Sequence, residues 1–270
     1  MAKAHEIDFQ LYGDDMQFVE IELDRDESVL AEAGAMMYMD DSIGMETIFG
    51  DGSGKNHGKG LMGKLIGAGK RVITGEGLFM TLFTNQAGGK AHVAFAAPYP
   101  GKIIPCDLSK FGGRLICQKD AFLCAAKGVS IDLHLQKKIG VGFFGGEGFI
   151  MQKLEGDGMT FLHAGGTIIK KELQPGEMLK IDTGCLVAMT SDVTYDVQFA
   201  GDIKSGIFGG EGLFLATLRG PGSVWLQSLP FSRMADKVYS AARGSKKGES
   251  KGFNNPLEEL SGITNLFGRD

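Results

Sequence analysis

The sequence predicts an all-β protein made of three similar antiparallel units, and three observations lead to this prediction. Glycine supplies 42 of the 270 residues against seven prolines, more than double its usual share of about 7%. These glycines separate short apolar runs of strand length, as expected of many tight turns. One phrase also recurs along the chain. It reads "FGGEGFIMQKLEG" at Phe144–Gly156, "FGGEGLFLATLRG" at Phe208–Gly220 and, more loosely, "ITGEGLFMTLFTN" at Ile73–Asn85.

A second repeated segment precedes each copy of this phrase. It is predicted to form a strand, a polar turn, a second strand, a tight turn and a third strand. Its copies are Val19–Asp41, Ile104–Ala126 and Ile169–Ser191, each with a first strand that ends in leucine. The unit is therefore about 65 residues of antiparallel β-structure. So few strands cannot bury an apolar face alone, and the units must share a core. We expect repeats at about 7–100, 101–167 and 168–230, in a pseudo-three-fold array.

Two further stretches are predicted strands because polar and apolar residues alternate strictly in them. They are "VSIDLHLQ", Val129–Gln136, and "VTYDVQFA", Val193–Ala200. In the first, the alternation predicts one apolar face and one polar face. The apolar face holds Val129, Ile131, Leu133 and Leu135, and the polar face holds Asp132, His134 and Gln136.

Short helices are predicted near 60–71 and at 231–243. The first, within "GKGLMGKLIGAGKRV" at 58–72, places leucine, methionine and isoleucine on one face and lysine on the other. The second has Ser232 as its expected N-cap. We therefore expect residues 1–243 to form a single β domain with a C-terminal helix. Residues 244–270 read as a polar linker and tail with little capacity to form a core.

Composition and charge limit the function classes. The formal net charge is −5 and the pI is about 5.6, which argues against a nucleic-acid partner. The sequence has no run of eighteen apolar residues and no apolar signal segment at its start, so no membrane-spanning helix is expected. The four cysteines are not in Cys-x-x-Cys spacing and are expected as buried thiols in a reducing, cytoplasmic setting.

The repeated glutamates Glu76, Glu147 and Glu211 are weak candidates for a binding site. They would form a ring of carboxylates about the pseudo-axis and bind a cation or a basic partner. The alternative is a structural turn, in which the glycines permit unusual backbone angles and glutamate accepts backbone hydrogen bonds. Repetition favours the structural interpretation, because each unit needs the same turn. Acid/base catalysis needs carboxylates in different environments, and a symmetric array supplies similar ones.

Other catalytic or ligand motifs are incomplete. In "GKNHGKGLMGKL" the residues Gly58, Gly63 and Lys64 fit a phosphate loop, but Leu65 stands where serine or threonine should hold magnesium. The five histidines show no metal-ligand spacing. We therefore predict no catalytic residue, metal or cofactor. The basic residues of the first predicted helix instead suggest contact with anionic lipid or a partner groove; they are Lys59, Lys64, Lys70 and Arg71.

The three Gly-Glu-Gly strands, the segment "GLMGKLIGAGKR" and the closing "WLQSLPFSRMAD" together carry a family likeness. They resemble a bacterial family of unknown function related to the altered-inheritance-of-mitochondria, or mitochondrial biogenesis, proteins. The likeness covers about Phe9–Asp236. It implies a TRAP-like fold, named after the trp RNA-binding attenuation protein, with three β-sandwich-like units per chain and trimers that close a larger ring. It implies no established biochemical activity.

These observations predict a non-catalytic binding or scaffold protein that forms a ring-like homotrimer. Two alternatives stay open. The first is a small-ligand-binding protein or enzyme with its site at a repeat or subunit interface. The second is a peripheral membrane organiser that uses the basic helix 58–72. Beyond a second copy of itself, the predicted partners are another protein or a membrane surface.

Overall fold

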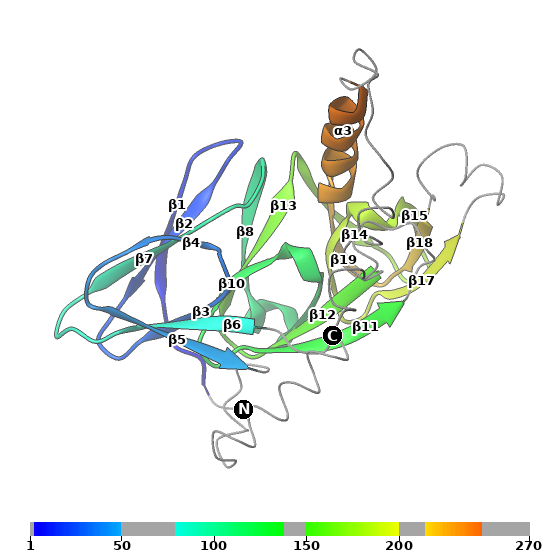
Figure 1. The fold of residues 1–270 in the computed structure, drawn as a ribbon. Coiled ribbons are helices and arrows are strands. Elements are labelled where there is room, and N and C mark those ends of the chain that lie inside the picture. The colour runs from blue at the N-terminus through cyan, green and yellow to red at the C-terminus, as the bar shows by residue number, and fades with distance from the viewer. Residues whose placement is uncertain (1–2, 50–78, 138–148, 200–213, 245–270) are drawn as a thin grey trace, which may run out of the picture. The chain divides into compact units, whose positions relative to one another are not determined.

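The computed structural model describes residues 3–49, 79–137, 149–199 and 214–244. The chain divides into two compact units, Met1–Ser232 and Arg233–Asp270. The strands lie in the first unit (Figure 1), and the described part of the second belongs to the helix α3, Phe231–Gly244. The all-β prediction is confirmed, since the described strands pair in antiparallel sheets. The predicted C-terminal helix is present, and the helix predicted near 60–71 lies outside the described residues.

Two of the four sheets come from the N-terminal half of the chain. The first sheet has the order β1-β2-β7-β4 and the second has the order β5-β6-β3-β10-β13-β8. Their strands are β1 (Asp8–Tyr12), β2 (Phe18–Leu23), β3 (Ser28–Glu32), β4 (Met36–Met39), β5 (Ile43–Phe49), β6 (Phe79–Asn85), β7 (Ala91–Ala96), β8 (Gly101–Asp107), β10 (Phe122–Ala126) and β13 (Met159–Gly165).

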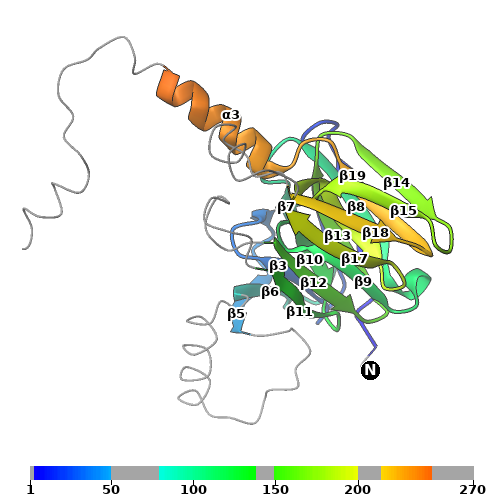
Figure 2. The same ribbon diagram turned by 90° about the vertical axis from the view of Figure 1, so that its right-hand side faces the viewer.

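The other two sheets complete the β-structure, and β14 lies beside β19 in both views (Figures 1 and 2). The third sheet has the order β11-β12-β9-β16-β19-β14 and the fourth has the order β15-β18-β17. Their strands, with three short 3₁₀ helices, are β9 (Arg114–Gln118), β11 (Ser130–Lys137), β12 (Phe149–Glu155), β14 (Ile168–Leu173), β15 (Met178–Asp182), β16 (Leu186–Thr190), β17 (Thr194–Phe199), β18 (Phe214–Arg219), β19 (Gly222–Gln227), η1 (Leu108–Phe111), η2 (Lys119–Ala121) and η3 (Thr183–Cys185).

The pairing order repeats every six strands. Adding six to each strand number of the second sheet gives the third sheet in order. We therefore treat β2–β7, β8–β13 and β14–β19 as three strand sets. The second and third sheets each join two halves from successive sets, whereas the first and fourth sheets contain a half from one set only. The pseudo-three-fold relation between the sets stays a prediction.

A β-bulge occurs at the same place in each strand set and fixes which residue of one set corresponds to which residue of the others. The pairing register shifts just before Tyr38 in β4, Cys124 in β10 and Ala188 in β16. Such an extra residue bends its strand and interrupts the ladder locally. Because a slip of one residue would turn every side chain to the opposite face, the shared bulge identifies Tyr38, Cys124 and Ala188 as equivalent positions.

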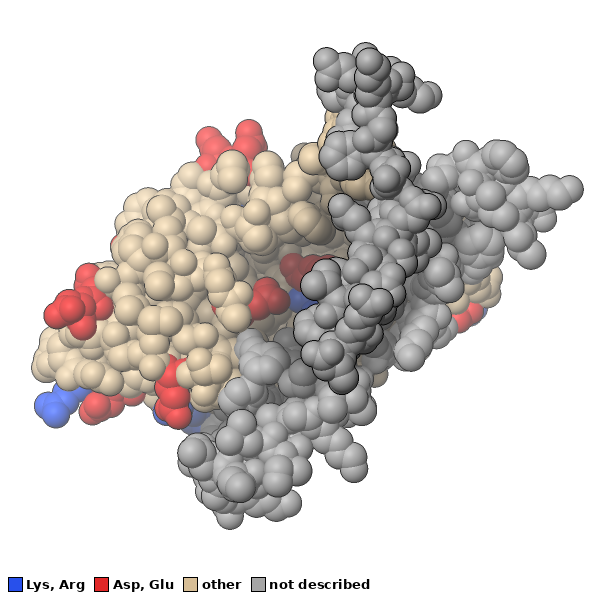
Figure 3. Space-filling view, viewed as in Figure 1, with Lys and Arg blue, Asp and Glu red and all other residues tan. Residues whose placement is uncertain are grey.

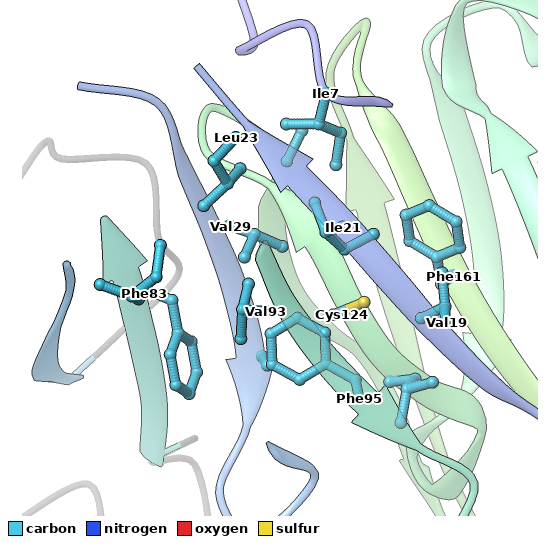
Figure 4. Close-up of a cluster of buried hydrophobic side chains, with 14 of the residues drawn as sticks. Ile7, Val19, Ile21, Leu23, Val29, Phe83, Val93, Phe95, Cys124 and Phe161 are labelled. Carbon is cyan, nitrogen blue, oxygen red and sulfur yellow. The ribbon is translucent and has the colours of Figure 1, made fainter. Parts of the chain in front are cut away.

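The hydrophobic core consists of three buried clusters that follow the sheets along the chain. Figure 4 shows the first cluster, which includes Ile21 of β2, Phe95 of β7 and Phe161 of β13. In β2 the burial alternates residue by residue, as expected of a strand with one solvent-facing side. In β10 every residue is buried. The second sheet is thus covered on both faces, because Cys124 joins the first cluster and Ala125 joins the second.

The predicted apolar face of β11 is buried in its first half. Val129 and Ile131 are buried as expected, whereas Leu133 is 42% exposed although it pairs with Gln152 in the same register as Ile131 with Leu154. The register shifts only after Leu133, before Leu135 pairs with Met151. Beyond that irregularity the strict two-residue period on which the prediction depended is interrupted.

Two local predictions also need correction. The leucine that ends the first strand of each repeat does so at Leu23 and Leu173, but Leu108 begins η1 instead. Asp107 accepts a hydrogen bond from the Ser109 backbone N–H at 3.1 Å and so caps that turn. Ser232 lies inside α3, because the helix already begins at Phe231.

Candidate functional site

The sequence-predicted site residues lie outside the described residues. The three glutamates fall in 50–78, 138–148 and 200–213, and the basic residues fall in 50–78. The site described below therefore uses none of them. The residues concerned are Glu76, Glu147, Glu211, Lys59, Lys64, Lys70 and Arg71.

Four titratable side chains gather where the first and second strand sets meet. Glu32 ends β3, and Tyr99 stands in the turn between β7 and β8. Asp120 belongs to η2, and His163 lies within β13. The rings of Tyr99 and His163 meet edge to face with centroids 4.3 Å apart. We call this group the junction cluster.

The carboxyl group of Glu32 is shifted toward its neutral form. Burial, reinforced by the negative charge of Asp120, raises its pKa to about 7, and Lys119 opposes the shift. Desolvation disfavours the charged form of a carboxyl group, which explains the direction. Glu32 therefore changes its protonation state near neutral pH, where a general acid or base is most effective.

His163 is held as a neutral imidazole. Burial lowers its pKa to about 4, and the nearby backbone of Tyr99 opposes this shift. Neither ring nitrogen has a partner of hydrogen-bond geometry among the described residues. A buried polar atom without a partner is costly in a folded protein. His163 is thus a polar group with unused hydrogen-bonding capacity inside the fold.

Tyr99 completes the junction cluster as a neutral hydroxyl. Burial and the charges of Asp120 and Glu32 raise its pKa to about 12. Near pH 7 Glu32 therefore exchanges a proton, whereas His163 and Tyr99 stay neutral. This arrangement can bind or pass on a single proton and can donate and accept hydrogen bonds.

A second group of aromatic and acidic side chains lies on the outer face of the first sheet. Tyr12 stacks on Phe18 with centroids 4.8 Å apart, and Phe18 meets Tyr38 edge to face at 6.3 Å. Both tyrosine hydroxyls donate to Glu20, that of Tyr12 at 3.3 Å. The bond to Glu20 is the main reason why the pKa of Tyr38 rises to about 12. We call Tyr12, Phe18, Glu20 and Tyr38 the outer-face cluster.

Charged pairs flank the outer-face cluster along β2 and β7. Glu22 contacts Lys90 and lies 3.3 Å from Nε2 of His92, whose Nδ1 is 3.3 Å from Asp40. These side chains are between about a third and a half exposed. Exposed ion pairs are worth little energetically, typically about 0 to 1 kcal/mol, so this network marks a solvated surface more than a source of stability.

The described residues contain no group of three or more metal-ligating side chains close enough to hold an ion. Cys106, Cys117 and Cys124 are buried thiols, and burial raises the pKa of each; Cys185 is half-buried. Within the same part of the chain, no helix has both the length and the apolar character needed to span a bilayer. Acidic side chains stand at several separate places on the described surface in Figure 3.

Sequence reasoning missed the junction cluster. Glu32 directly follows an apolar run, and an acidic residue next to a core strand is a signal that could have indicated a partly buried carboxyl group. Asp120 and Tyr99 carry no signal of their own, because the charge of Asp120 acts on Glu32 only after β3 and β10 pair. His163 is expected to be internal from its apolar surroundings, but its neighbour Tyr99 comes from a distant turn.

The fold and the site define an all-β protein of antiparallel sheets that are shared between successive strand sets. The chain belongs to the family described as Mitochondrial biogenesis AIM24, whose model matches residues 9–229. It is 34% identical over 226 residues to an uncharacterised protein of Streptococcus pyogenes serotype M6, covering 82% of this chain and 85% of that protein.

A crystal structure of another Streptococcus pyogenes protein has a similar fold. The TM-score is 0.67 at 24% sequence identity, and the match covers 87% of this chain and all of that one. At this identity the likeness concerns the fold alone. The family prediction from the sequence is confirmed.

Proposed function

We propose that this protein is a non-catalytic binding or scaffold protein whose copies assemble into a ring-like homotrimer. The carrying observation is that the two end sheets are incomplete. Each inner sheet contains two halves from successive strand sets, six strands in all. Among the strands that the structure describes, the first sheet has β2-β7-β4 without the second half, and the fourth sheet has β15-β18-β17 without the first half.

Incomplete sheets favour assembly for a physical reason. An exposed strand edge presents unpaired backbone groups and promotes pairing with another chain. Head-to-tail pairing between identical chains forms a closed ring when the rotation per copy closes, and otherwise forms an open filament. A copy number of three is what the TRAP-like resemblance implies, and a closed ring pairs the β4 edge of each copy with the β15 edge of the next.

Native mass spectrometry of the protein purified from its own cells tests this proposal. We expect the mass of three chains. Monomers at micromolar concentration would contradict the proposal. The same spectrum reports any retained small molecule, which bears on the alternative function below.

A small-ligand or enzymatic role at a repeat interface is the second candidate, and the junction cluster favours it. Glu32 with a pKa of about 7 lies in the same cluster as the unpartnered imidazole of His163. Perturbed acids next to unsatisfied polar groups are typical of functional sites. A ligand mass that is present in wild type and absent in His163→Leu would support this role, and equal retention by both proteins would remove it.

A peripheral membrane role through residues 58–72 stays a proposal carried by the sequence. Binding to vesicles with anionic lipid should disappear when the four basic residues become glutamine. Equal binding by wild type and variant would end this proposal. The residues to replace are Lys59, Lys64, Lys70 and Arg71.

A further inference from the structure

Two strands at the ends of the sheet series lack the partner that their equivalents have. In the second sheet β10 pairs with β3, and in the third sheet β16 pairs with β9. By the six-strand repeat, β4 is equivalent to β10 and β16, and β15 is equivalent to β3 and β9. On their outer sides, β4 and β15 have no partner among the described strands. They lie at opposite ends of the β unit (Figure 1).

We call the pairing of β10 with β3 the first internal joint and the pairing of β16 with β9 the second. Both joints use the same register. At the first joint Cys124 lies opposite Ala31. At the second joint Ala188 lies opposite Cys117. The pairings of β3, β9 and β15 with β6, β12 and β18 make Ala31, Cys117 and Ile181 equivalent. A third joint in this register would therefore place Tyr38 opposite Ile181.

Backbone hydrogen bonds show that the β15 edge directs its polar groups outward. At the first joint the Lys127 N–H donates to the Ser28 carbonyl at 3.0 Å. Ser28 and, two residues on, Leu30 therefore direct their backbone groups toward β10, because alternate residues of a strand bond to the same side. Met178 and Lys180 hold these positions in β15. Their backbone groups point away from β18.

The edge of β4 presents backbone N–H and C=O groups that complement those of the β15 edge. The Asp40 N–H donates to the His92 carbonyl at 2.9 Å, so Asp40 bonds toward β7. Its neighbour Met39 then directs its N–H and C=O away from β7. Met39 is equivalent to Ala125 and Met189, which lie opposite Leu30 and Ile116 at the internal joints.

Side chains at the β4 edge are exposed where their equivalents are buried. Met37 is 54% exposed, whereas Leu123 and Val187 at the same position are 2% and 0% exposed. Burying a large apolar side chain is worth about 1.5 to 3 kcal/mol. The β4 edge therefore has apolar surface that the internal joints remove from water.

In the third strand set, one sheet face is exposed where the equivalent face of the first set is buried. Val19 is fully buried in the same cluster as Phe161 of the next strand set, but its equivalent Ile169 is 50% exposed. At the next position, Ile21 and Cys106 are buried whereas Lys171 is exposed. Among the described strands, no further set follows the third one to supply such a cover.

The outer-face cluster carries the residues that would supply the missing cover. Phe18 is equivalent to Ile103 and Ile168, which line the first and second internal clusters. Glu20 is equivalent to Pro105 and Lys170, so it would face the β14 side of a neighbouring copy. A carboxylate there complements the ammonium group of Lys171. Electrostatic complementarity of this kind selects one docking register over others.

We propose that β4 of one copy pairs antiparallel with β15 of a second copy, and that the outer-face cluster of the first copy covers Ile169 and Lys171 of the second. The expected opposite pairs are Tyr38 with Ile181, Met39 with Lys180 and Asp40 with Leu179. The joint rebuilds a full sheet from the first and fourth sheets. This inference rests on the proposed assembly and specifies the surface through which it forms.

Two residues differ from the internal joints in an informative way. Tyr38 and Ile181 are larger than the cysteine and alanine at those positions, so this joint has more apolar area to bury. Lys180 replaces Leu30 and Ile116, and its aliphatic stem would lie along Met39 with the ammonium group at the rim. Charged side chains on edge strands also suppress pairing with unrelated strands.

Disulfide trapping between two differently tagged chains tests the joint. Asp40→Cys in one chain and Leu179→Cys in the other would form a pair without ladder hydrogen bonds, with Cα atoms about 4.5 Å apart, which suits a disulfide. Both chains carry Cys185→Ser. The buried thiols react slowly, since burial raises the pKa of Cys106 to about 12. Met16→Cys, on an exposed residue away from β4, replaces Asp40→Cys in the control.

The expected result is a doubly tagged, disulfide-linked dimer as the major product, absent from the control mixture. A link that forms only within one chain, in the variant carrying both cysteines, would overturn the second copy as the partner. Absence of the link in a protein that native mass spectrometry shows to be trimeric would overturn the joint and leave the trimer standing. A monomeric protein would overturn both.

Discussion

Cys124 of β10 lies directly opposite Ala31 of β3, and this pair joins two strand sets into one sheet. Both residues are fully buried and belong to the same cluster. The corresponding pair, Ala188 and Cys117, has the same geometry in the next sheet. Small side chains at these positions let neighbouring sheets approach closely, so the core continues from one strand set to the next.

Lys180→Pro should abolish assembly and leave the fold intact. The Lys180 N–H points away from β18, so its loss removes a bond of the proposed joint and none within the fourth sheet. Proline is tolerated on such a free edge. We expect monomers by light scattering with an almost unchanged melting temperature. The matched control is Leu30→Pro, where the equivalent N–H is used inside the chain; this variant should unfold. Trimers formed by Lys180→Pro would contradict the prediction.

Glu32→Gln should remove a loss of stability that accompanies the rise of pH toward neutrality. The folded pKa of Glu32 is about 7 against an ordinary value of 4.5. The folded state therefore binds the proton more tightly, and its stability falls as pH rises from 4.5 to 7. The variant should gain about 2 to 3 kcal/mol relative to wild type between pH 5 and pH 8. Denaturant unfolding at the two pH values measures this difference, and parallel stabilities would refute it.

His163→Gln should act in the opposite direction. The folded pKa of His163 is about 4 against 6.5, so wild type loses stability as pH falls from 6.5 to 4, because the unfolded state takes up the proton. Glutamine stands at the equivalent position, where Gln227 accepts from the Gly165 N–H and donates to the Gly184 carbonyl, each at 2.8 Å. Melting temperatures at pH 7.5 and pH 5 should converge in the variant. An unchanged acid loss would show that another group is responsible.

Asn85→Ala should destabilise the first strand set. The Asn85 side chain is fully buried and donates to the Leu23 and Gly89 carbonyls at 2.8 and 2.7 Å. Its Oδ1 accepts from the Ala87 N–H at 2.9 Å. Alanine leaves the buried Leu23 carbonyl and two part-buried backbone groups without these partners. An unsatisfied buried group costs about 1 to 3 kcal/mol, so we expect a loss of about 2 to 3 kcal/mol by denaturant unfolding. The control Gln86→Ala alters a neighbouring side chain and should change stability by much less.

The repeated order of strands and turns was predictable from the sequence, because turn glycines and strand-length apolar runs recur at a similar spacing. The leucine that closes the first strand illustrates this, since Leu23, Leu108 and Leu173 are equivalent by strand pairing. Local signals of this kind depend on the backbone conformation of neighbouring residues, so they can be recognised without knowledge of tertiary contacts. They therefore predict elements better than the sites that these elements form.

The joints and the junction cluster were not predictable for the same reason. The exchange of halves between sets depends on long-range pairing, such as Ala125 with Leu30, which no local pattern records. The pKa of Glu32 depends on Asp120, whose position is set by that pairing. The bulge before Cys124 likewise carries no turn residue that would announce it.

Hydrogen exchange at the backbone amides of Met39 and Lys180 tests the central claim most directly. Both N–H groups point outward from unpaired edges in a single copy, so they would exchange about as fast as amides in an exposed turn. If β4 and β15 pair between copies, both amides are protected in wild type, and Met39 loses its protection in Lys180→Pro. Fast exchange at both positions in the wild-type protein at high concentration would contradict the account.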